Sequence, residues 1–212
     1  MKKKTLIITA IVTLLISTSF AQKREYQDHI WTYEGEKKEH TLGLYGGINL
    51  SYSPIREKDA YNLGAKAVLV FDNRFGIGLA GKAVSYDHET YLQEDNRPVR
   101  LEAGYTGIIL EYIQPLGNRV KLNFSLLSGS GLVQYRYHKE FSEELTWTEE
   151  IPDRTTYSVL EPGLEFQTRL SNKWWIGLQA TYRFTSPVKM LEVNTNILET
   201  YTAGISIHYG IF

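Results

Sequence analysis

The sequence predicts an all-β protein, an eight-stranded antiparallel up-and-down transmembrane β-barrel, and three observations carry that prediction. Apolar residues alternate with small or polar ones along most of the chain after residue 40, the pattern of strands with one apolar face. Short turns alternate with longer connections, as in a meander of antiparallel neighbours. The apolar face is almost free of charge, which suits contact with lipid.

The first 39 residues do not share this alternation. Residues 1–21 have the form of a secretory signal peptide: three lysines, an apolar core over 6–16 and a small-x-small cleavage site at 19–21. The alternative, an uncleaved membrane anchor, needs a longer apolar core than this one. Residues 22–39 are charged and aperiodic, so we expect an N-terminal periplasmic segment there and a barrel over 40–212.

Composition narrows the function classes. Without the signal peptide, 20 Lys and Arg stand against 24 Asp and Glu, and this mild negative charge argues against nucleic acid as a partner. The chain has no cysteine, so neither disulfides nor a lipid on a cysteine are available to an exported protein. No stretch after the signal peptide approaches 18 apolar residues, which argues against a transmembrane helix.

Eight segments carry the alternation. In chain order they span about 41–52, 61–72, 75–86, 101–113, 119–137, 157–170, 174–184 and 201–212. The fifth loses its pattern near Gly129 and Gly131, where we expect a bulge or a change of register. The sixth contains Pro162, which inside a closed barrel calls for a bulge or an irregular strand start.

The connections between these segments alternate in length. The sequences "DNR", "QPLGN" and "SNK" are typical of tight turns. We expect the other four connections, at roughly 53–60, 87–100, 138–155 and 186–199, to be longer loops. All the tight turns then lie at one end of the barrel and the long loops at the other.

The polar face decides between two kinds of eight-stranded barrel. A soluble lipocalin-like barrel is apolar inside, whereas a membrane barrel is apolar outside. Gly, Ser, Asn and Thr crowd the polar face, as the narrow lumen of an eight-stranded barrel requires. Aromatic residues of the apolar face gather near both strand ends, which is typical of the girdles at membrane interfaces. We therefore expect the apolar face to point outward.

These features resemble the small eight-stranded outer-membrane barrels of Gram-negative bacteria, the group of OmpX and the OmpA membrane domain. The resemblance covers about 40–212 and rests on pattern and strand count. It implies location in the outer membrane with both termini in the periplasm, and outer-membrane lipid and the barrel assembly machinery as partners. The family typically ends on an aromatic assembly signal, which Phe212 matches, although its parity is that of the lumen-facing positions.

The polar face also predicts a charge network in the lumen. Its members are Lys66, Lys82, Glu111, Lys121, Glu161, Glu165, Arg169 and Arg183. Counting from the turns places Lys66 opposite Lys82, and Glu161 opposite Arg183. Long side chains can bridge so narrow a lumen, so we expect Glu161 and Glu165 to neutralise both lysines and Arg183. Glu111 and Lys121 should form a second pair, and the lumen should be plugged.

The sequence offers no catalytic, cofactor or metal site. None of its five histidines forms a metal-spaced pair, and Ser206 with His208 has no carboxylate nearby in sequence. We therefore expect a non-enzymatic protein with a structural or adhesive role, binding a protein partner through its extracellular loops. Two alternatives stay open: a component of an envelope secretion or assembly system, and a lipid A-modifying outer-membrane enzyme.

Overall fold

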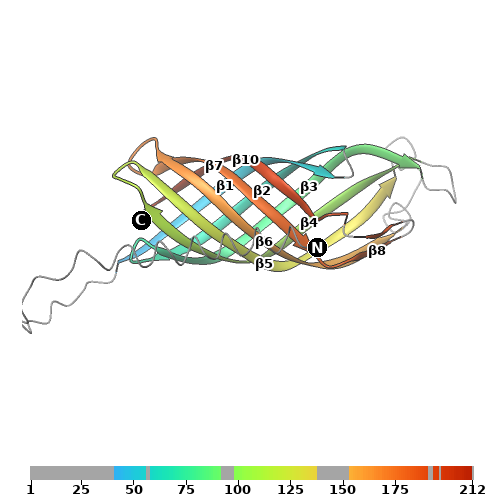
Figure 1. Cartoon of the computed structure of the whole chain (residues 1–212), viewed down its shortest axis with the longest axis horizontal. Coiled ribbons are helices and arrows are strands. Elements are labelled where there is room, and N and C mark those ends of the chain that lie inside the picture. The colour runs from blue at the N-terminus through green and yellow to red at the C-terminus, as the bar shows by residue number, and fades with distance from the viewer. Residues whose placement is uncertain are drawn as a thin grey trace, which may run out of the picture. The chain divides into compact units, whose positions relative to one another are not determined.

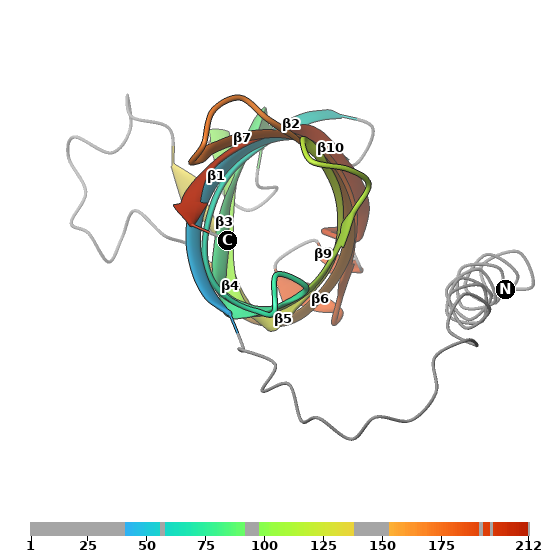
Figure 2. The ribbon, with the colours of Figure 1, turned by 90° about the vertical axis from the view of Figure 1, so that its left-hand side faces the viewer.

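The computed structural model describes residues 41–55, 58–91, 98–137, 153–190, 193–195 and 197–211. Eight of its strands close into an antiparallel barrel, as predicted (Figures 1 and 2). They are β1 (Leu42–Ile55), β2 (Lys58–Phe71), β3 (Phe75–Tyr91), β4 (Pro98–Pro115), β5 (Val120–Tyr137), β6 (Arg154–Arg169), β7 (Trp174–Thr185) and β10 (Thr200–Ile211). The signal peptide, the N-terminal segment and Phe212 lie outside the described residues.

Every barrel strand pairs with its neighbours in the chain, and β10 closes the ring on β1. In that closing ladder Leu44 lies opposite Ile211 and Ile48 opposite Ile207. Both edges of β10 are therefore hydrogen-bonded, as a lipid environment demands of every backbone group. In the part of the chain that the structure describes, no helix is long and apolar enough to cross a membrane.

The connections differ from the prediction at the loop end. The strands β1 and β2 continue to Ile55 and Lys58, which face each other, so the expected long loop over 53–60 is wrong. The strand β3 likewise runs to Tyr91, with a shift of register between Ser85 and Glu89. The last connection carries its own hairpin of β8 (Val188–Met190) and β9 (Val193–Thr195), which the sequence analysis missed.

The outward face of the barrel is apolar along its strands, as predicted. Leu79 and Leu178 expose 67% and 65% of their surface, whereas the neighbouring Ala80 and Gly177 point inward. Aromatic side chains meet across strands near both ends: Tyr52 with Tyr61 at 6.1 Å towards the loops, and Trp174 with Tyr209 at 4.9 Å towards the turns. A membrane-spanning barrel has this kind of surface: an apolar band with a girdle of aromatic residues at each edge.

The expected irregularity in β5 is wrong. The register of β5 runs without a shift against β4 and against β6. The apparent break near Gly129 arises because Leu127 and Val133 are apolar but face the lumen, while Ser130 faces outward. Gly129 itself is needed for close strand approach, since an added Cβ would lie 2.0 Å from the carbonyl oxygen of Thr106.

Pro162 interrupts one ladder without producing a bulge. It pairs with Leu126 of β5, but the ladder between β6 and β7 passes from Leu160 opposite Phe184 directly to Gly163 opposite Thr181. The register is the same on both sides of this gap, so the proline removes a hydrogen bond and leaves the strand alignment intact.

Candidate functional site

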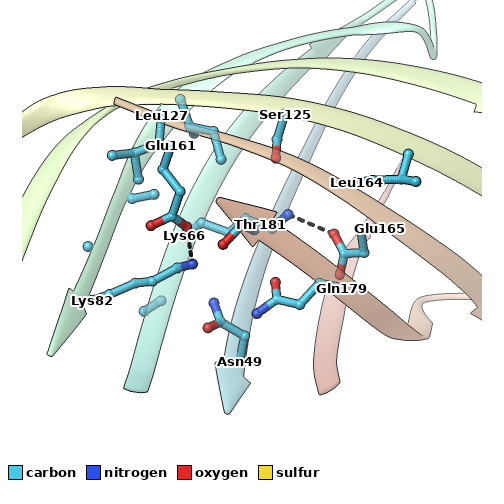
Figure 3. A pocket seen from close by; sticks show the side chains of 14 residues that line it. Asn49, Lys66, Lys82, Ser125, Leu127, Glu161, Leu164, Glu165, Gln179 and Thr181 are labelled. Atoms are coloured by element: carbon cyan, nitrogen blue, oxygen red, sulfur yellow. Dashed lines mark hydrogen bonds and ion pairs between the residues drawn. The ribbon is translucent and has the colours of Figure 1, made fainter. Parts of the chain in front are cut away.

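The centre of the lumen is crossed by ion pairs between opposite walls of the barrel (Figure 3). Lys66 of β2 donates to Glu111 of β4 at 2.8 Å and to Glu165 of β6 at 3.1 Å. Lys82 of β3 donates to Glu161 of β6. All of these side chains are at least nine-tenths buried. Burial leaves such charges little water, so their partners and hydrogen bonds must offset the lost solvation.

Glu165 is the most densely bonded carboxylate of this network. One oxygen accepts from Lys66 and from Gln167, the latter at 2.9 Å. The other oxygen accepts from the hydroxyl of Ser206 and lies 2.6 Å from Nε2 of His208. Gly177 makes room for this cluster, since a Cβ there would meet both the Ser206 hydroxyl and the Glu165 carboxylate.

The carboxylates also bind two tyrosines that line the lumen. Tyr45 donates its hydroxyl to Glu111, and Tyr105 donates its hydroxyl to Glu161. Both rings are almost fully buried. Each carboxylate of the network therefore has a cation and a neutral donor, which is how a buried charge cluster becomes fully satisfied.

Ser206, His208 and Glu165 lack the geometry of a catalytic triad. A triad needs the serine and the carboxylate on different nitrogens of the histidine. Here Nε2 of His208 faces both the Glu165 oxygen and, at 2.9 Å, the Ser206 hydroxyl. Its Nδ1 is buried and has no hydrogen-bond partner among the described residues. The histidine therefore does not link the serine to the carboxylate in the order that a triad requires.

The network differs from the expected one in its pairing. The register places Lys66 opposite Ala80, and Lys82 opposite Gly64, so the two lysines do not face each other. The reason is that the turn over 72–74 centres on Asn73, which shifts the count by two residues. Two separate groups were also expected, but Lys66 joins Glu111 directly to Glu165.

Arg183 does not form the expected ion pair directly. Its Nε donates to the carbonyl of Leu198 at 2.9 Å, and its guanidinium lies 5.3 Å from the ring centroid of Tyr105. The side chain is fully buried, and its two terminal nitrogens have no hydrogen-bond partner among the described residues. Tyr105 contacts both Arg183 and Glu161, and the bond from Arg183 fastens Leu198, in the connection between β7 and β10, to the barrel wall.

The remaining two predicted residues lie at the turn end, around Trp175. The Lys121 ammonium is 3.5 Å from the Trp175 ring centroid and buried, whereas Arg169 lies 4.9 Å from the same centroid and is exposed. Phe212, the predicted assembly signal, lies outside the described residues.

A small cavity of about 30 Å³ lies beside the ion pairs. Its wall includes Asn49 and Gln179, which point toward the two lysines and Glu165 (Figure 3). The oxygen of the Asn49 amide and the nitrogen of the Gln179 amide have no hydrogen-bond partner among the described residues. A volume of this size holds about two water molecules, which would complete these bonds.

Sequence reasoning found the lysines and carboxylates of the network and missed the tyrosines and the histidine that bind the carboxylates. Tyr45, Tyr105 and His208 all fall on the polar face, and a buried hydroxyl or imidazole on a face with carboxylates needs a hydrogen-bond partner. That requirement is the signal that points to them. Which carboxylate each of them binds depends on which strands face each other across the lumen. The alternation of apolar and polar residues does not give that information.

No protein-family model matches the chain, and no curated protein sequence does. The fold is similar to solved outer-membrane barrels. Neisserial surface protein A matches with a TM-score of 0.53 and 8% identity, over 84% of this chain and 99% of that one. Ail, the attachment invasion locus protein of Yersinia pestis, in complex with sucrose octasulfate, matches with a TM-score of 0.48 and 13% identity. The match covers 80% of this chain and 97% of that one.

The N-terminal barrel domain of OprF from Pseudomonas aeruginosa also matches, with a TM-score of 0.46 and 10% identity, over 80% of this chain and 97% of that one. At these identities the likeness shows the fold alone. The closed eight-stranded ring and the apolar outward face together make the chain an outer-membrane β-barrel.

Proposed function

We propose that this outer-membrane barrel is a non-conducting, non-enzymatic protein that acts through its outer rim, by binding a partner or by supporting the envelope. The observation that carries the proposal is the filled lumen. Because side chains cross the barrel from wall to wall, the interior offers neither a solute path nor an accessible reaction site. Activity then has to reside on the surfaces that extend from the membrane.

The lumen is filled at more than one level. Ion pairs and their hydrogen-bonded partners cross it at the centre and leave a cavity of only about 30 Å³. Towards the loops an apolar cluster contains Leu101, Val133, Tyr157, Val188 and Leu198, each at most 7% exposed. A water-filled channel needs a continuous polar path, and this apolar cluster interrupts it.

The outer rim extends further on one side of the barrel than on the other. The strands β3, β4 and β5 contain 17, 18 and 18 residues, whereas β7 and β10 contain 12 each. Their paired ends reach Thr90 opposite Val99 and Val99 opposite Tyr137. Strands paired beyond the membrane form a rigid platform, and a rigid platform lowers the entropic cost of binding a partner.

The buried position of Ser206 supports the non-enzymatic part of the proposal. Ser206 is only 2% exposed, and its hydroxyl is engaged by Glu165 and His208. A nucleophile must reach its substrate, and this one faces a packed lumen. The name of the similar Neisserial surface protein A is in keeping with a role at the cell surface.

Planar-bilayer recording tests the lumen. We expect the purified protein to show no stable conductance, and a Lys82→Ser and Glu161→Ser double variant to admit more ions because it removes one crossing pair. A stable, large conductance of the unaltered protein would contradict the proposal.

Complementation of a deletion strain tests the rim. The chain with residues 87–100 replaced by a two-residue Asn-Gly turn keeps the pairing of Ser85 with Glu102 and should fold, but it should fail to restore the wild-type phenotype. A Ser206→Ala variant should restore it fully and leave lipid A unchanged by mass spectrometry. If the shortened rim complements while Ser206→Ala does not, the activity lies in the lumen and the proposal is wrong.

A further inference from the structure

The outward face of the barrel differs from side to side at its loop end. On β1, β2, β7 and β10 it carries exposed aromatic side chains towards the loops, namely Tyr52, Tyr61, Phe184 and Tyr201. The described outward positions of β4, β5 and β6 towards the loops contain no aromatic residue. Five exposed hydroxyl side chains, which we call the hydroxyl patch, occupy this side: Thr106, Ser128, Ser130, Thr156 and Ser158.

The strand register places the hydroxyl patch at the level of the outer aromatic girdle. Phe184 of β7 lies opposite Leu160 of β6, and Leu160 lies opposite Ser128 of β5. One outward position nearer the loops, a continuous row of hydroxyls crosses three strands: Thr106, Ser130 and Ser158. Aromatic residues are the usual side chains at this level. A hydroxyl that faces acyl chains gives up its hydrogen bonds to water, so the patch suits a neighbour with polar groups at this depth.

Three arginines lie beyond the hydroxyl patch on the same three strands. Arg100 of β4 is opposite Arg136 of β5. Arg154 of β6 is opposite Gln134, which precedes Arg136 by two residues. All three positions have the parity of the patch residues on their own strands, which are six residues away on β4 and β5 and four on β6. At the usual rise and tilt of barrel strands, these separations place the arginines about 10–15 Å farther out along the barrel axis.

Carboxylates accompany these arginines mainly on the β3 side. Glu89 of β3 lies opposite Arg100. In β4, β5 and β6 the outward positions beyond the hydroxyl patch contain one carboxylate, Glu102, which accepts from Gln134 at 3.1 Å. Arg136 and Arg154 are on the side away from β3. A guanidinium has five N–H donors, so an arginine that binds a carboxylate still has donors for a second anion.

The depth of the arginines distinguishes between classes of lipid. The polar region of a phospholipid leaflet is about 5–8 Å thick, half the difference between the whole bilayer and its hydrocarbon core. The arginine positions are about 10–15 Å beyond the hydroxyl patch and therefore outside that region. A glycolipid extends farther from the membrane, because its saccharide is attached above the acyl chains. Anionic groups on the saccharide can reach this level.

We propose that this side of the barrel binds an anionic glycolipid of the outer leaflet. The phosphates or carboxylates of its saccharide contact Arg136 and Arg154, and the polar groups at its acyl junction contact the hydroxyl patch. Arginine binds such oxyanions through two parallel hydrogen bonds. Serine and threonine hydroxyls both donate and accept, which suits the hydroxyl and amide groups where a saccharide joins its acyl chains.

Short-range fluorescence quenching tests the proposal. The chain has no cysteine, so an introduced cysteine carries a single fluorophore. Leu132→Cys places it within the hydroxyl patch, opposite Thr156, and Leu50→Cys places it on β1, outside the patch. Both leucines are exposed, 42% and 51%. Each labelled protein is reconstituted in phosphatidylcholine nanodiscs that contain a small fraction of lipopolysaccharide with a nitroxide quencher near its acyl junction.

Quenching by the labelled lipopolysaccharide is divided by quenching from nitroxide-labelled phosphatidylcholine, which corrects for the depth of each fluorophore. We expect this ratio to be at least about fivefold higher at Leu132→Cys than at Leu50→Cys, since one cation near an anionic surface contributes about that factor. Adding Arg136→Gln and Arg154→Gln should bring the two ratios within about twofold of each other. The matched control Arg74→Gln removes an exposed arginine from a turn at the opposite end of the barrel and should leave the ratio unchanged.

Equal ratios at the two labelled positions, or a ratio that the paired arginine substitutions do not lower, would overturn the proposal. Lipopolysaccharide stripped of its phosphates should be enriched less, and unchanged enrichment would contradict the ionic contacts. Fluorescence at Leu132→Cys that depends on the number of barrels per nanodisc, and not on the glycolipid, would assign this side to a second copy of the chain. Heat-dependent gel mobility confirms that each variant is folded.

This inference goes beyond the proposed function and depends only on the orientation of the barrel in the outer membrane. Its experiment measures which lipid surrounds the barrel, whereas bilayer conductance and complementation test the lumen and the rim. Absence of enrichment at the hydroxyl patch would therefore leave the closed lumen untouched. A conducting lumen would contradict the proposed function without affecting the glycolipid contact.

Discussion

Replacing Lys66 by methionine should destabilise the barrel more than any change on its rim. In the crossing network, the set of ion pairs that Lys66 and Lys82 form with Glu111, Glu161 and Glu165, Lys66 contacts two carboxylates: Glu111 at 2.8 Å and Glu165 at 3.1 Å. Methionine keeps much of the volume of the side chain but carries no charge. Both carboxylates then stay buried without their shared cation.

The size of the effect follows from these distances. At an effective dielectric constant of about 20, the two contacts contribute roughly 6 and 5 kcal/mol of gross attraction. Repulsion between the two carboxylates and the desolvation of all three groups offset most of this. Removing one partner of a buried pair typically costs about 3–5 kcal/mol, and we expect the Lys66→Met change to fall in that range.

Reversible urea unfolding in lipid bilayers measures this loss. The control is Lys173→Met, the same substitution at an exposed turn residue, which should change the free energy of unfolding by less than about 0.5 kcal/mol. Adding Glu111→Gln to Lys66→Met removes one stranded charge and should restore about 1–2 kcal/mol. If Lys66→Met costs no more than Lys173→Met, the crossing network does not stabilise the barrel and the reasoning fails.

Three further predictions concern the lipid face, the strand contacts and the outer connection. Leu79→Arg should cost about 2–4 kcal/mol of stability in bilayer refolding because it places a cation in lipid, whereas Leu116→Arg in an exposed turn should cost less than about 1 kcal/mol. Gly129→Ala should cost about 1–3 kcal/mol or more, since its Cβ would meet a carbonyl at 2.0 Å, whereas Gly104→Ala, at 3.6 Å from its nearest atom, should be tolerated in the same assay. Arg183→Met frees the backbone carbonyl that it binds at 2.9 Å, so amide hydrogen exchange should accelerate over 186–199 and stay unchanged in the β1–β2 hairpin.

The sequence contains enough information to predict the fold because side chains along a barrel strand alternate between the lipid face and the lumen, with a period of two residues. Parity alone decides which face a residue occupies, and the assignment of Leu79 and Leu178 to the lipid face needs nothing else. The lengths of the loops are less predictable. Charged residues near Ile55 and Lys58 favour a loop by composition, yet those two residues pair, because strands beyond the membrane still gain from completing their ladder.

The partners inside the lumen could not be predicted in the same way. Parity places Lys66, Glu111 and Glu165 in the interior but does not say which of them share a level. That level depends on how far each strand is displaced along the barrel relative to the strand across from it, and the displacement is a property of the closed ring. The pairing of neighbouring strands is also sensitive to the count: an error of two residues at the turn over 72–74 placed Lys66 opposite Lys82, whereas it lies opposite Ala80.

The crossing charges also explain why the barrel interior is not simply apolar. Slipping a strand by one residue moves all of its side chains to the other face. If both faces were apolar, such a slip would cost little in lipid. With Lys66 and Lys82 inside, the slipped strands β2 and β3 would expose these cations to lipid, at about 2–4 kcal/mol each near the midplane.

The distribution of apolar residues in the lumen follows the same logic. Leu127 and Val133 occupy interior positions of β5, where the outward Ser128 and Ser130 alternate with them. At this part of β5 the outward side chains are polar and the inward ones apolar, so the two faces of the strand still differ in polarity. Glu165 shows the opposite arrangement: its outward neighbours Leu164 and Phe166 are apolar, and the interior position between them is charged and paired. At such positions the buried charge marks the lumen face of the strand, because a slip by one residue would carry it into lipid.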